Sequence, residues 1–455
     1  MPVPAVIEKI LNQHNIEVAV VDAPATVDFI GQAKTTLLQD RNGKIQAIYS
    51  SDSILDIDAL CRLTQRKLTV CKSQDIQAIC NKAKVDRLPT IPLALGFDVI
   101  IDQQLLSHRE LKLDSGSEAC LVTITIEQFN QLIDGVQTGS IAVNETELQS
   151  ASLDMIHDID DITYAVANFT QLRIKQRLEE TLECPPLPET AQRIIQLRAN
   201  PDADIKDLSD IIETDPSLAA QIISWAASPY YAAPGKIQSV HDAIVRVLGF
   251  DMVLNLSLGL ALGRTLKLPK DTASGFTPYW QQAIYAATAV AALVQLMPTK
   301  ARPAKGMMYL SGLLHNFGYL ILADVFPVYF STICRYQEAN PVTNHCYIER
   351  HLLGVTREQL GAWLMRTWSM PDEINTAIRF QNEVEFEGEN SDYANLMLIT
   401  LRLLRKHGIG DASSATIPDH LFEHLQLDRE EAEQAIMTLM ESSAELNAMA
   451  ATMAA

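Results

Sequence analysis

The residues of this sequence best suited to chemistry are His315 and Asn316, which lie next to each other inside an apolar run, residues 309–324. Divalent metal ions take anionic or imidazole ligands, so His315 is a candidate ligand, whereas the neutral Asn316 is a poor one. A polar pair in such a run must be hydrogen-bonded or bind something, because an unpaired buried polar group costs about 1–3 kcal/mol. The pair therefore marks a candidate site in a buried helix.

Other histidines and the cysteines give weaker signals. His241 and Asp242 begin a predicted helix, where the charge of Asp242 favours the N-terminus, so no ligand role is predicted for this pair. His345 and His351 lie six residues apart, unlike the spacing of four that suits a zinc site, and are interpreted as ordinary histidines. The seven cysteines form no CxxC pair, which predicts reduced thiols in a cytoplasmic protein.

The composition limits the classes of function. A length of 455 residues predicts two or three domains, and a hydrophobic content of 47% is enough for buried cores. The net charge of −20 argues against electrostatic binding to nucleic-acid phosphates or to an anionic membrane surface. The longest apolar runs are too short to cross a bilayer, and the first residues lack the basic segment of a signal peptide.

The first part of the chain alternates short strands and helices. The hairpin signal is the clearest, because a turn at residues 40–43 separates two apolar runs. The mixture predicts an α/β domain with a mixed sheet over residues 1–143. Residues 134–152 are polar and weakly patterned, which predicts a linker. The predicted strands are 16–21, 33–38, 45–49, 99–101 and 121–124, and the predicted helices are 4–14, 54–63, 75–83 and 126–133.

Three segments of this region carry a family resemblance. They are GQAKTTLL at 31–38, RLPTIPLALGFDVIIDQQLL at 87–106 and LDSGSEACLVTI at 113–124. In this order they resemble the YbaK/ProX-type domain, which occurs as free-standing aminoacyl-tRNA deacylases and as an insert in some prolyl-tRNA synthetases. The resemblance covers most of the predicted α/β domain.

The resemblance implies a small pocket that deacylates aminoacyl-tRNA without a metal. Lys34 would position the tRNA terminus and the ester; in the alternative interpretation it is a strand lysine that points to solvent. Pro89 and Pro92 remove two N–H donors from a loop that is richer in glycine in working deacylases, which counts against catalysis. The other residues that the resemblance places at the pocket are Asp102, Gly116 and Ser117.

Residues 144–183 are predicted to connect two domains, and a helix is predicted from residue 153. Its apolar residues recur at alternating steps of four and three, which is an a/d stripe over about two heptads. Such a stripe is expected to pack along the next domain and set the angle between the domains, or to pair with its copy in a homodimer. The stripe consists of Met155, Ile159, Ile162, Val166 and Phe169.

Nearly every segment after residue 170 has helical spacing. CPPLPETAQRIIQL at 184–197, followed by IIETDPSLAAQIISWAASPYY and IQSVHDAIVRVLGFDMVLNLSL, resembles the HDOD domain, the HD-related output domain of bacterial signalling proteins. The resemblance implies an all-α bundle over 170–410. A helical extension is expected over 411–455, with fraying at 444–455. The predicted helices are 189–199, 205–213, 218–227, 239–248, 251–262, 279–296, 306–324, 326–339, 343–353, 357–369, 371–380 and 393–408, with a last one from 428.

The run around His315 resembles the LLHDIGKL core of the HD superfamily, in which a His-Asp pair helps to hold a divalent metal for phosphohydrolysis. The resemblance places Asn316 where the family has the aspartate and Arg357 where it usually has a histidine. Both changes disfavour Mg²⁺ or Mn²⁺, so no metal is expected, and a hydrogen-bonded remnant of the site should remain. The degenerate HD site is predicted to consist of Tyr285, His315, Asn316, Arg357, Gln381 and Asn382.

Three hypotheses for function follow. The favoured one is a non-catalytic signalling or adaptor protein, a pseudoenzyme without cofactor, whose HDOD bundle binds a protein partner or a small signalling ligand. The second is an aminoacyl-tRNA deacylase with an HDOD regulatory domain, which would need a basic surface for tRNA. The third is a metal-dependent phosphohydrolase, which the missing ligands contradict. Either a small basic surface or a solvated charged face would be formed by Arg66, Lys67, Lys82, Lys84 and Arg87.

Overall fold

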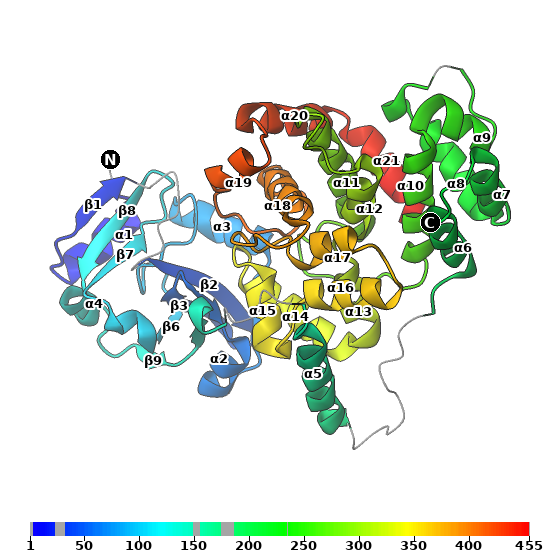
Figure 1. The fold of residues 1–455 in the computed structure, drawn as a ribbon. Coiled ribbons are helices and arrows are strands. Elements are labelled where there is room, and N and C mark those ends of the chain that lie inside the picture. Colours follow the sequence, from blue (N-terminus) through cyan, green and yellow to red (C-terminus); the bar gives the residue numbers. More distant parts are fainter. Residues whose placement is uncertain (1–2, 23–31, 149–154, 174–185, 234, 455) are drawn as a thin grey trace. The chain divides into compact units, whose positions relative to one another are not determined.

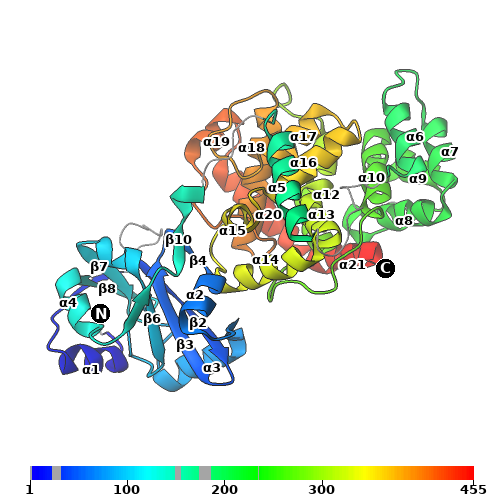
Figure 2. The same ribbon diagram turned by 90° about the horizontal axis from the view of Figure 1, so that it is seen from below.

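The computed structural model has an α/β part and a helical part, which confirms the predicted fold class (Figures 1 and 2). Its contacts divide the chain into two compact units. The first unit comprises Met1–Ser150 and Thr332–Thr343, and the second comprises Ala151–Ser331 and Asn344–Ala455. The structure describes residues 3–22, 32–148, 155–173, 186–233 and 235–454.

A five-stranded sheet in the order β5-β2-β3-β6-β9 forms the centre of the first unit. The predicted hairpin is present: β2 pairs antiparallel with β3, and the Asn42 N–H donates to Asp40 Oδ1 at 2.8 Å in the turn. β6 then adds parallel to β3, and β9 adds parallel to β6. The strands are β2 Ala33–Asp40, β3 Gly43–Ser50, β5 Thr69–Val70, β6 Asp98–Asp102 and β9 Gln137–Gly139.

Two smaller sheets and four α-helices complete the first unit. One sheet has the antiparallel order β1-β8-β7, and the other pairs β10 with β4. Ile7 and Leu11 of α1 and Phe129 and Leu132 of α4 share one core with the sheet residue Ile48. The elements are α1 Ala5–Gln13, β1 Ala19–Asp22, β4 Ser53–Leu55, α2 Ile57–Thr64, α3 Ser73–Ala83, β7 Glu110–Asp114, β8 Cys120–Thr125, α4 Ile126–Leu132 and β10 Ala142–Asn144, with 3₁₀ turns Gln103–Ser107 and Glu145–Leu148.

The predicted linker at 134–152 is wrong over its first part. β9 and β10 lie in this stretch and pair with β6 and β4, which are remote in the sequence. Each of these strands has only three residues, so the sequence shows no alternating pattern; the partner strands hold them in place. Residues 149–154 lie outside the described part of the chain.

The connecting helix is α5, Asp158–Arg173, and it packs on α16 within the second unit. Ile162 is buried as the stripe predicts, but Ile159 is 51% exposed and therefore does not belong to the packed face. Its neighbour Asp158 is buried instead, with its carboxylate 2.6 Å from Arg379 Nε. An ion pair thus anchors the helix where only apolar contacts were predicted. The side chain of Phe169 lies outside the described residues.

The second unit is a bundle in which α11 contacts α12, α18, α20 and α21. Its glycines allow close helix crossings: a Cβ on Gly312 would lie 2.4 Å from Ala287 Cα of α11, and one on Gly318 would lie 1.8 Å from the Arg357 carbonyl oxygen of α16. The helices are α6 Glu189–Arg198, α7 Ile205–Glu213, α8 Pro216–Ala226, α9 Val240–Ala243 with a π-helical turn Ile244–Leu248, α10 Phe250–Gly263, α11 Tyr279–Leu296, α12 Lys305–Leu314, α13 Phe317–Val325, α15 His345–Leu353, α16 Arg357–Thr367, α17 Asp372–Arg379, α18 Ser391–Lys406, α19 Asp419–His424, α20 Arg429–Glu441 and α21 Ser443–Ala454. Helix α14, Pro327–Ala339, begins in this unit, and its residues from 332 on belong to the first unit.

Two features of the bundle differ from the prediction. The single helix predicted over 306–324 is broken at His315 and Asn316 into α12 and α13. The last residues do not fray: α21 is a helix whose Leu446 and Met449 are buried, so packing supplies the stability that its sequence lacks. Among the described residues, no helix is both long and apolar enough to cross a membrane.

Candidate functional site

The break between α12 and α13 places His315 and Asn316 in the interior of the second unit, where both are buried. The His315 Nδ1–H donates to the Gly312 carbonyl oxygen at 2.7 Å. Burial lowers the pKa of His315 to about 4, so the ring is neutral near pH 7. Gln381 Nε2 donates to the His315 carbonyl oxygen at 2.8 Å, which ties α17 to the break.

Asn316 joins two neighbouring helices through its carboxamide. Its Nδ2 donates to Gln282 Oε1 of α11 at 3.2 Å, and its Oδ1 accepts from Arg357 Nη1 of α16 at 3.3 Å. Four of the six predicted site residues are therefore linked directly: His315, Asn316, Arg357 and Gln381. The Asn382 Nδ2 donates to Glu358 Oε1 at 2.9 Å, beside the same residues.

Tyr285 lies outside this network, which corrects the prediction. Its hydroxyl contacts the Ser443 carbonyl oxygen and Asn447 Oδ1, each at 3.3 Å, and so belongs to the packing of α21. Gln282, one helical turn earlier on α11, contacts Asn316 in its place. A shift of one turn keeps the same face of a helix, so sequence spacing alone does not distinguish the two positions.

Arg357 is the centre of a buried ion-pair network that we call the Arg357 network, formed by Asn316, Glu349, Arg357 and Asp411. Arg357 Nε lies 2.5 Å from Glu349 Oε1, its backbone N–H donates to Glu349 Oε2 at 2.7 Å, and its Nη1 lies 2.7 Å from Asp411 Oδ2. Burial opposes the charge on Arg357, but Glu349 and Asp411 outweigh burial and raise its pKa above the ordinary value. The guanidinium therefore keeps its charge in the interior.

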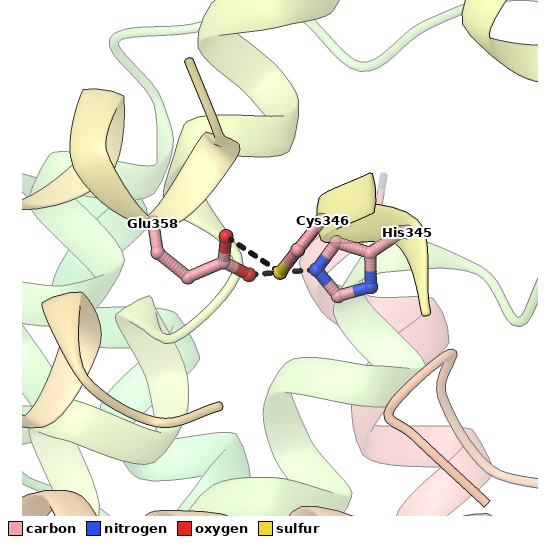
Figure 3. A group of neighbouring side chains, drawn as sticks. All are labelled: His345, Cys346 and Glu358. Atoms are coloured by element: carbon pink, nitrogen blue, oxygen red, sulfur yellow. Dashed lines mark hydrogen bonds and ion pairs between the residues drawn. The ribbon is translucent and has the colours of Figure 1, made fainter. Parts of the chain in front are cut away.

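A second buried cluster, His345, Cys346 and Glu358, lies next to this network (Figure 3). His345 Nε2 is 2.7 Å from Glu358 Oε1, and the Cys346 thiol donates to Glu358 Oε2 at 3.5 Å. Burial and Arg357 oppose protonation of His345, but Cys346, Glu358 and Asp411 outweigh them and hold its pKa well above the usual value. Burial raises the pKa of the Cys346 thiol to about 12.

Some of these side chains line a cavity of about 20 Å³, which has room for about one water molecule. Divalent ions need anionic or imidazole donors, yet Asn316 is a neutral carboxamide bonded to Gln282 and Arg357, and the Arg357 guanidinium already pairs with Glu349 and Asp411. The residues present therefore do not fit the divalent metal of the HD superfamily. The polar lining residues are Gln282, His315, Asn316, His345, Glu358, Gln381, Asn382 and Asp411.

Sequence reasoning missed half of this site. His345 was set aside because its spacing from His351 does not suit a metal, but its partner is Glu358 on the next helix. Glu349 and Asp411 gave no signal, because a charged residue in a sequence looks solvated until its buried partner is known. Gln282, Cys346 and Glu358 were also missed.

The second candidate site lies in the first unit around Lys34. Lys34 is half-buried on β2, its Nζ donates to Thr343 Oγ1 at 3.1 Å, and it lies 5.2 Å from the centroid of the Tyr49 ring. Burial lowers the pKa of Lys34 to about 8, against the opposing effects of Glu145 and Asp52. Lys34 is therefore not a lysine that simply extends into solvent.

Asp102 and the turn at Gly116 and Ser117 are held by local contacts. The Asp102 carboxylate accepts from the N–H groups of Ile141 and Ala142, at 2.8 and 2.9 Å, and so fixes the start of β10. The Gly116 N–H donates to Asp114 Oδ1 at 2.7 Å, in the turn between β7 and β8. Among the described residues, no hydrogen bond joins these positions to Lys34, so a pocket shared by all four stays a prediction.

The cluster of basic residues in the first unit is partly neutralised. Arg66 Nη2 lies 2.5 Å from Asp40 Oδ1, and Arg87 Nε lies 2.5 Å from Asp114 Oδ2. Two of the five cations proposed for a tRNA surface are thus paired with carboxylates. This pairing favours the interpretation as an ordinary charged face.

The fold and the buried network define a class of protein: an α/β unit joined to an HD-like helical bundle that holds a buried arginine network. A comparison with known families matches residues 184–384 to the HDOD domain. A crystal structure from Marinobacter aquaeolei VT8, described as a "Putative signal transduction protein", is 40% identical with a TM-score of 0.91 and full coverage of both chains. The chain belongs to the HDOD domain family.

Two other relatives cover parts of the chain. A protein of Treponema pallidum (strain Nichols), described as uncharacterized, is 23% identical over 270 residues, which are 58% of this chain and 50% of that protein. The chain thus matches about half the length of this curated relative. A "putative trans-editing enzyme for prolyl tRNA synthetase" is 16% identical with a TM-score of 0.28, over 32% of this chain and 99% of that one. This last likeness says nothing of activity.

Proposed function

We propose that this protein is a non-catalytic signalling protein whose helical unit binds a partner in the cytoplasm. The observation that carries the proposal is the position of Arg357, whose guanidinium pairs with Glu349 and Asp411 in the interior of the bundle. A protein cation there satisfies the carboxylates that a metal ion would otherwise neutralise. The network keeps the bundle folded and leaves no role for a metal.

The dimensions of the cavities support binding of a partner over turnover of a nucleotide. Pockets for drug-sized ligands measure about 300–1,000 Å³, far above the 20 Å³ of the cavity at His315. A more open hollow of about 500 Å³ lies between α8 and α21, lined by Trp225 and Met449 among others. It has the size for a small ligand or for side chains of a protein partner.

Metal content and hydrolysis test this proposal directly. We expect purified protein to carry no stoichiometric transition metal and to hydrolyse neither cyclic dinucleotides nor nucleotides, because Asn316 is a neutral carboxamide and the Arg357 guanidinium supplies the positive charge that pairs with Glu349 and Asp411. Elemental analysis and product chromatography measure both. The exposed His241→Ala is the matched control for His315→Ala. One or two metal ions per chain, lost in His315→Ala and retained in His241→Ala, would overturn the proposal.

A second candidate function is aminoacyl-tRNA deacylation, which the environment of Lys34 favours. An amine with a pKa of about 8 is partly neutral near physiological pH and can take part in acid–base steps. Glu145 and Asp52 lie close enough to influence its charge. This arrangement is compatible with a pocket that positions an ester.

Deacylation of mischarged alanyl- or cysteinyl-tRNA separates the two functions. Under the main proposal we expect equal rates for the wild type and for Lys34→Ala, because the Lys34 amine is already hydrogen-bonded to Thr343. Exposed Lys9→Ala, outside the candidate basic surface, is the control. Release of the amino acid that is lost in Lys34→Ala but retained in Lys9→Ala would replace the signalling proposal with an editing enzyme.

A further inference from the structure

Residues 332–343, which we call the docked segment, belong to the first compact unit although the HDOD match runs through them. The segment contains the last part of α14 and the turn that follows it. Within the first unit it contacts β2, β3, β4 and the start of α2. These contacts include hydrogen bonds to Lys34, Thr36, Leu55 and Asp56.

Asn340 makes the most complete set of these contacts. Its Oδ1 accepts from the Leu55 N–H at 2.7 Å, and its Nδ2 donates to the Leu55 carbonyl oxygen at 3.3 Å. The same Oδ1 accepts from the Tyr49 hydroxyl at 3.3 Å. Leu55 pairs with Ala142 of β10, so the carboxamide of Asn340 hydrogen-bonds β4 in the way that a further strand would.

Two further contacts hold the docked segment at the Lys34 end of the sheet. The Thr36 hydroxyl donates to the Ala339 carbonyl oxygen at 2.8 Å, and Lys34 Nζ donates to Thr343 Oγ1 at 3.1 Å. At the other end of the segment, the Tyr336 hydroxyl donates to Asp56 Oδ1 at 2.7 Å and accepts from the Asp58 N–H at 3.3 Å. The segment thus engages an ammonium, a hydroxyl, a carboxylate and backbone groups.

We propose that the docked segment is an internal ligand of the first unit, which occupies the surface around Lys34 and competes with any external ligand for it. The carboxamide of Asn340 pairs with both backbone groups of Leu55, and the Thr343 hydroxyl accepts from the Lys34 ammonium, so the end of a helix and its following turn satisfy polar groups that a bound peptide could also satisfy. The occupant is a stretch of this chain. The inference does not depend on catalysis by Lys34 or on the signalling proposal.

The full-length protein allows a direct test with two variants and a control. Asn340→Ala removes the contacts to Leu55 and Tyr49, whereas Thr343→Val keeps the shape of the side chain and removes only the hydroxyl that Lys34 contacts. Val342→Ala is the matched control, because Val342 lies in the same segment but is 65% exposed. Sulfo-N-hydroxysuccinimidyl acetate reports the accessibility of the Lys34 amine by peptide mass spectrometry. Hydrogen exchange of the Leu55 amide reports release of the docked segment from β4.

Each hydrogen bond that is lost should shift the equilibrium between the docked and the released state of the segment by roughly fivefold toward release. We therefore expect exchange at Leu55 to rise by about tenfold or more in Asn340→Ala, and acetylation of Lys34 to rise by about fivefold in Thr343→Val. Val342→Ala should match the wild type in both. If Asn340→Ala fails to fold, as judged by its thermal melt, Thr343→Val alone decides the question. Wild-type rates at Lys34 in Thr343→Val, or at Leu55 in a folded Asn340→Ala, would overturn the proposal.

Discussion

Replacement of Arg357 by methionine should lower the free energy of unfolding by about 3–5 kcal/mol. The substitution keeps much of the side-chain volume but removes the only partner of opposite charge that Glu349 contacts among the described ion pairs. It also removes a partner of Asp411, and the residue is 1% exposed, so water cannot replace the lost contacts. Urea denaturation followed by circular dichroism measures the change.

Lys406→Met is the matched control for this substitution. Lys406 also pairs with a carboxylate, Glu433, at 2.8 Å, but its side chain is 52% exposed. A solvated pair contributes about 0–1 kcal/mol, so the control should remain close to the wild type. Equal effects of the two substitutions would show that Arg357 is not the cation on which the bundle depends.

The other large effect is expected at Gly318, where α13 crosses α16. A methyl group there would lie 1.8 Å from the backbone carbonyl oxygen of Arg357, and a backbone atom cannot rotate away as a side chain can. Gly318→Ala should therefore force the two helices apart and cost about 3 kcal/mol or more, at or above the upper end for overpacking. Thermal and urea unfolding measure this loss.

Gly361→Ala is the control on the facing helix of the same crossing. A methyl group at Gly361 would lie 3.2 Å from the Gly318 N atom and from Ile378 Cγ2, a contact that a shift of a few tenths of an ångström relieves. We expect Gly361→Ala to cost clearly less than Gly318→Ala. The reverse order would mean that the crossing opens easily and that Arg357 is not held by it.

Where local context carried a signal, sequence reasoning selected residues that the structure brings together. His315 and Asn316 stood out because they interrupt an apolar run, and Arg357 and Gln381 followed from the resemblance to the HD superfamily. The ion-pair network at the site depends on contacts between segments that are remote in the sequence. Glu349 and Asp411 can be recognised as members of the site only when the fold shows that both pair with Arg357 of α16. Tyr285 was assigned one helical turn away from the residue that contacts Asn316.

The fold shows the same division between local and remote signals. The hairpin of β2 and β3 and most of the helices were predicted, because a turn signal or a helical period lies within each segment. β9 and β10 were missed because strands of three residues have no period of their own. The anchoring of α5 by Asp158 was missed because a polar residue on a helix is normally expected to face water.

The docked segment also has a consequence for the order in which the protein is made. Residues 151–331 must be synthesised between the two parts of the first unit. At about 5–20 residues per second, a ribosome needs about 10–40 seconds for that stretch. During this time the backbone groups of Leu55 and the hydroxyl of Thr36 have been made, but Asn340 and Ala339, their partners in the finished protein, do not yet exist. Synthesis of the first unit therefore begins before that of the second unit and is completed only after residues 151–331 of the second unit have been synthesised.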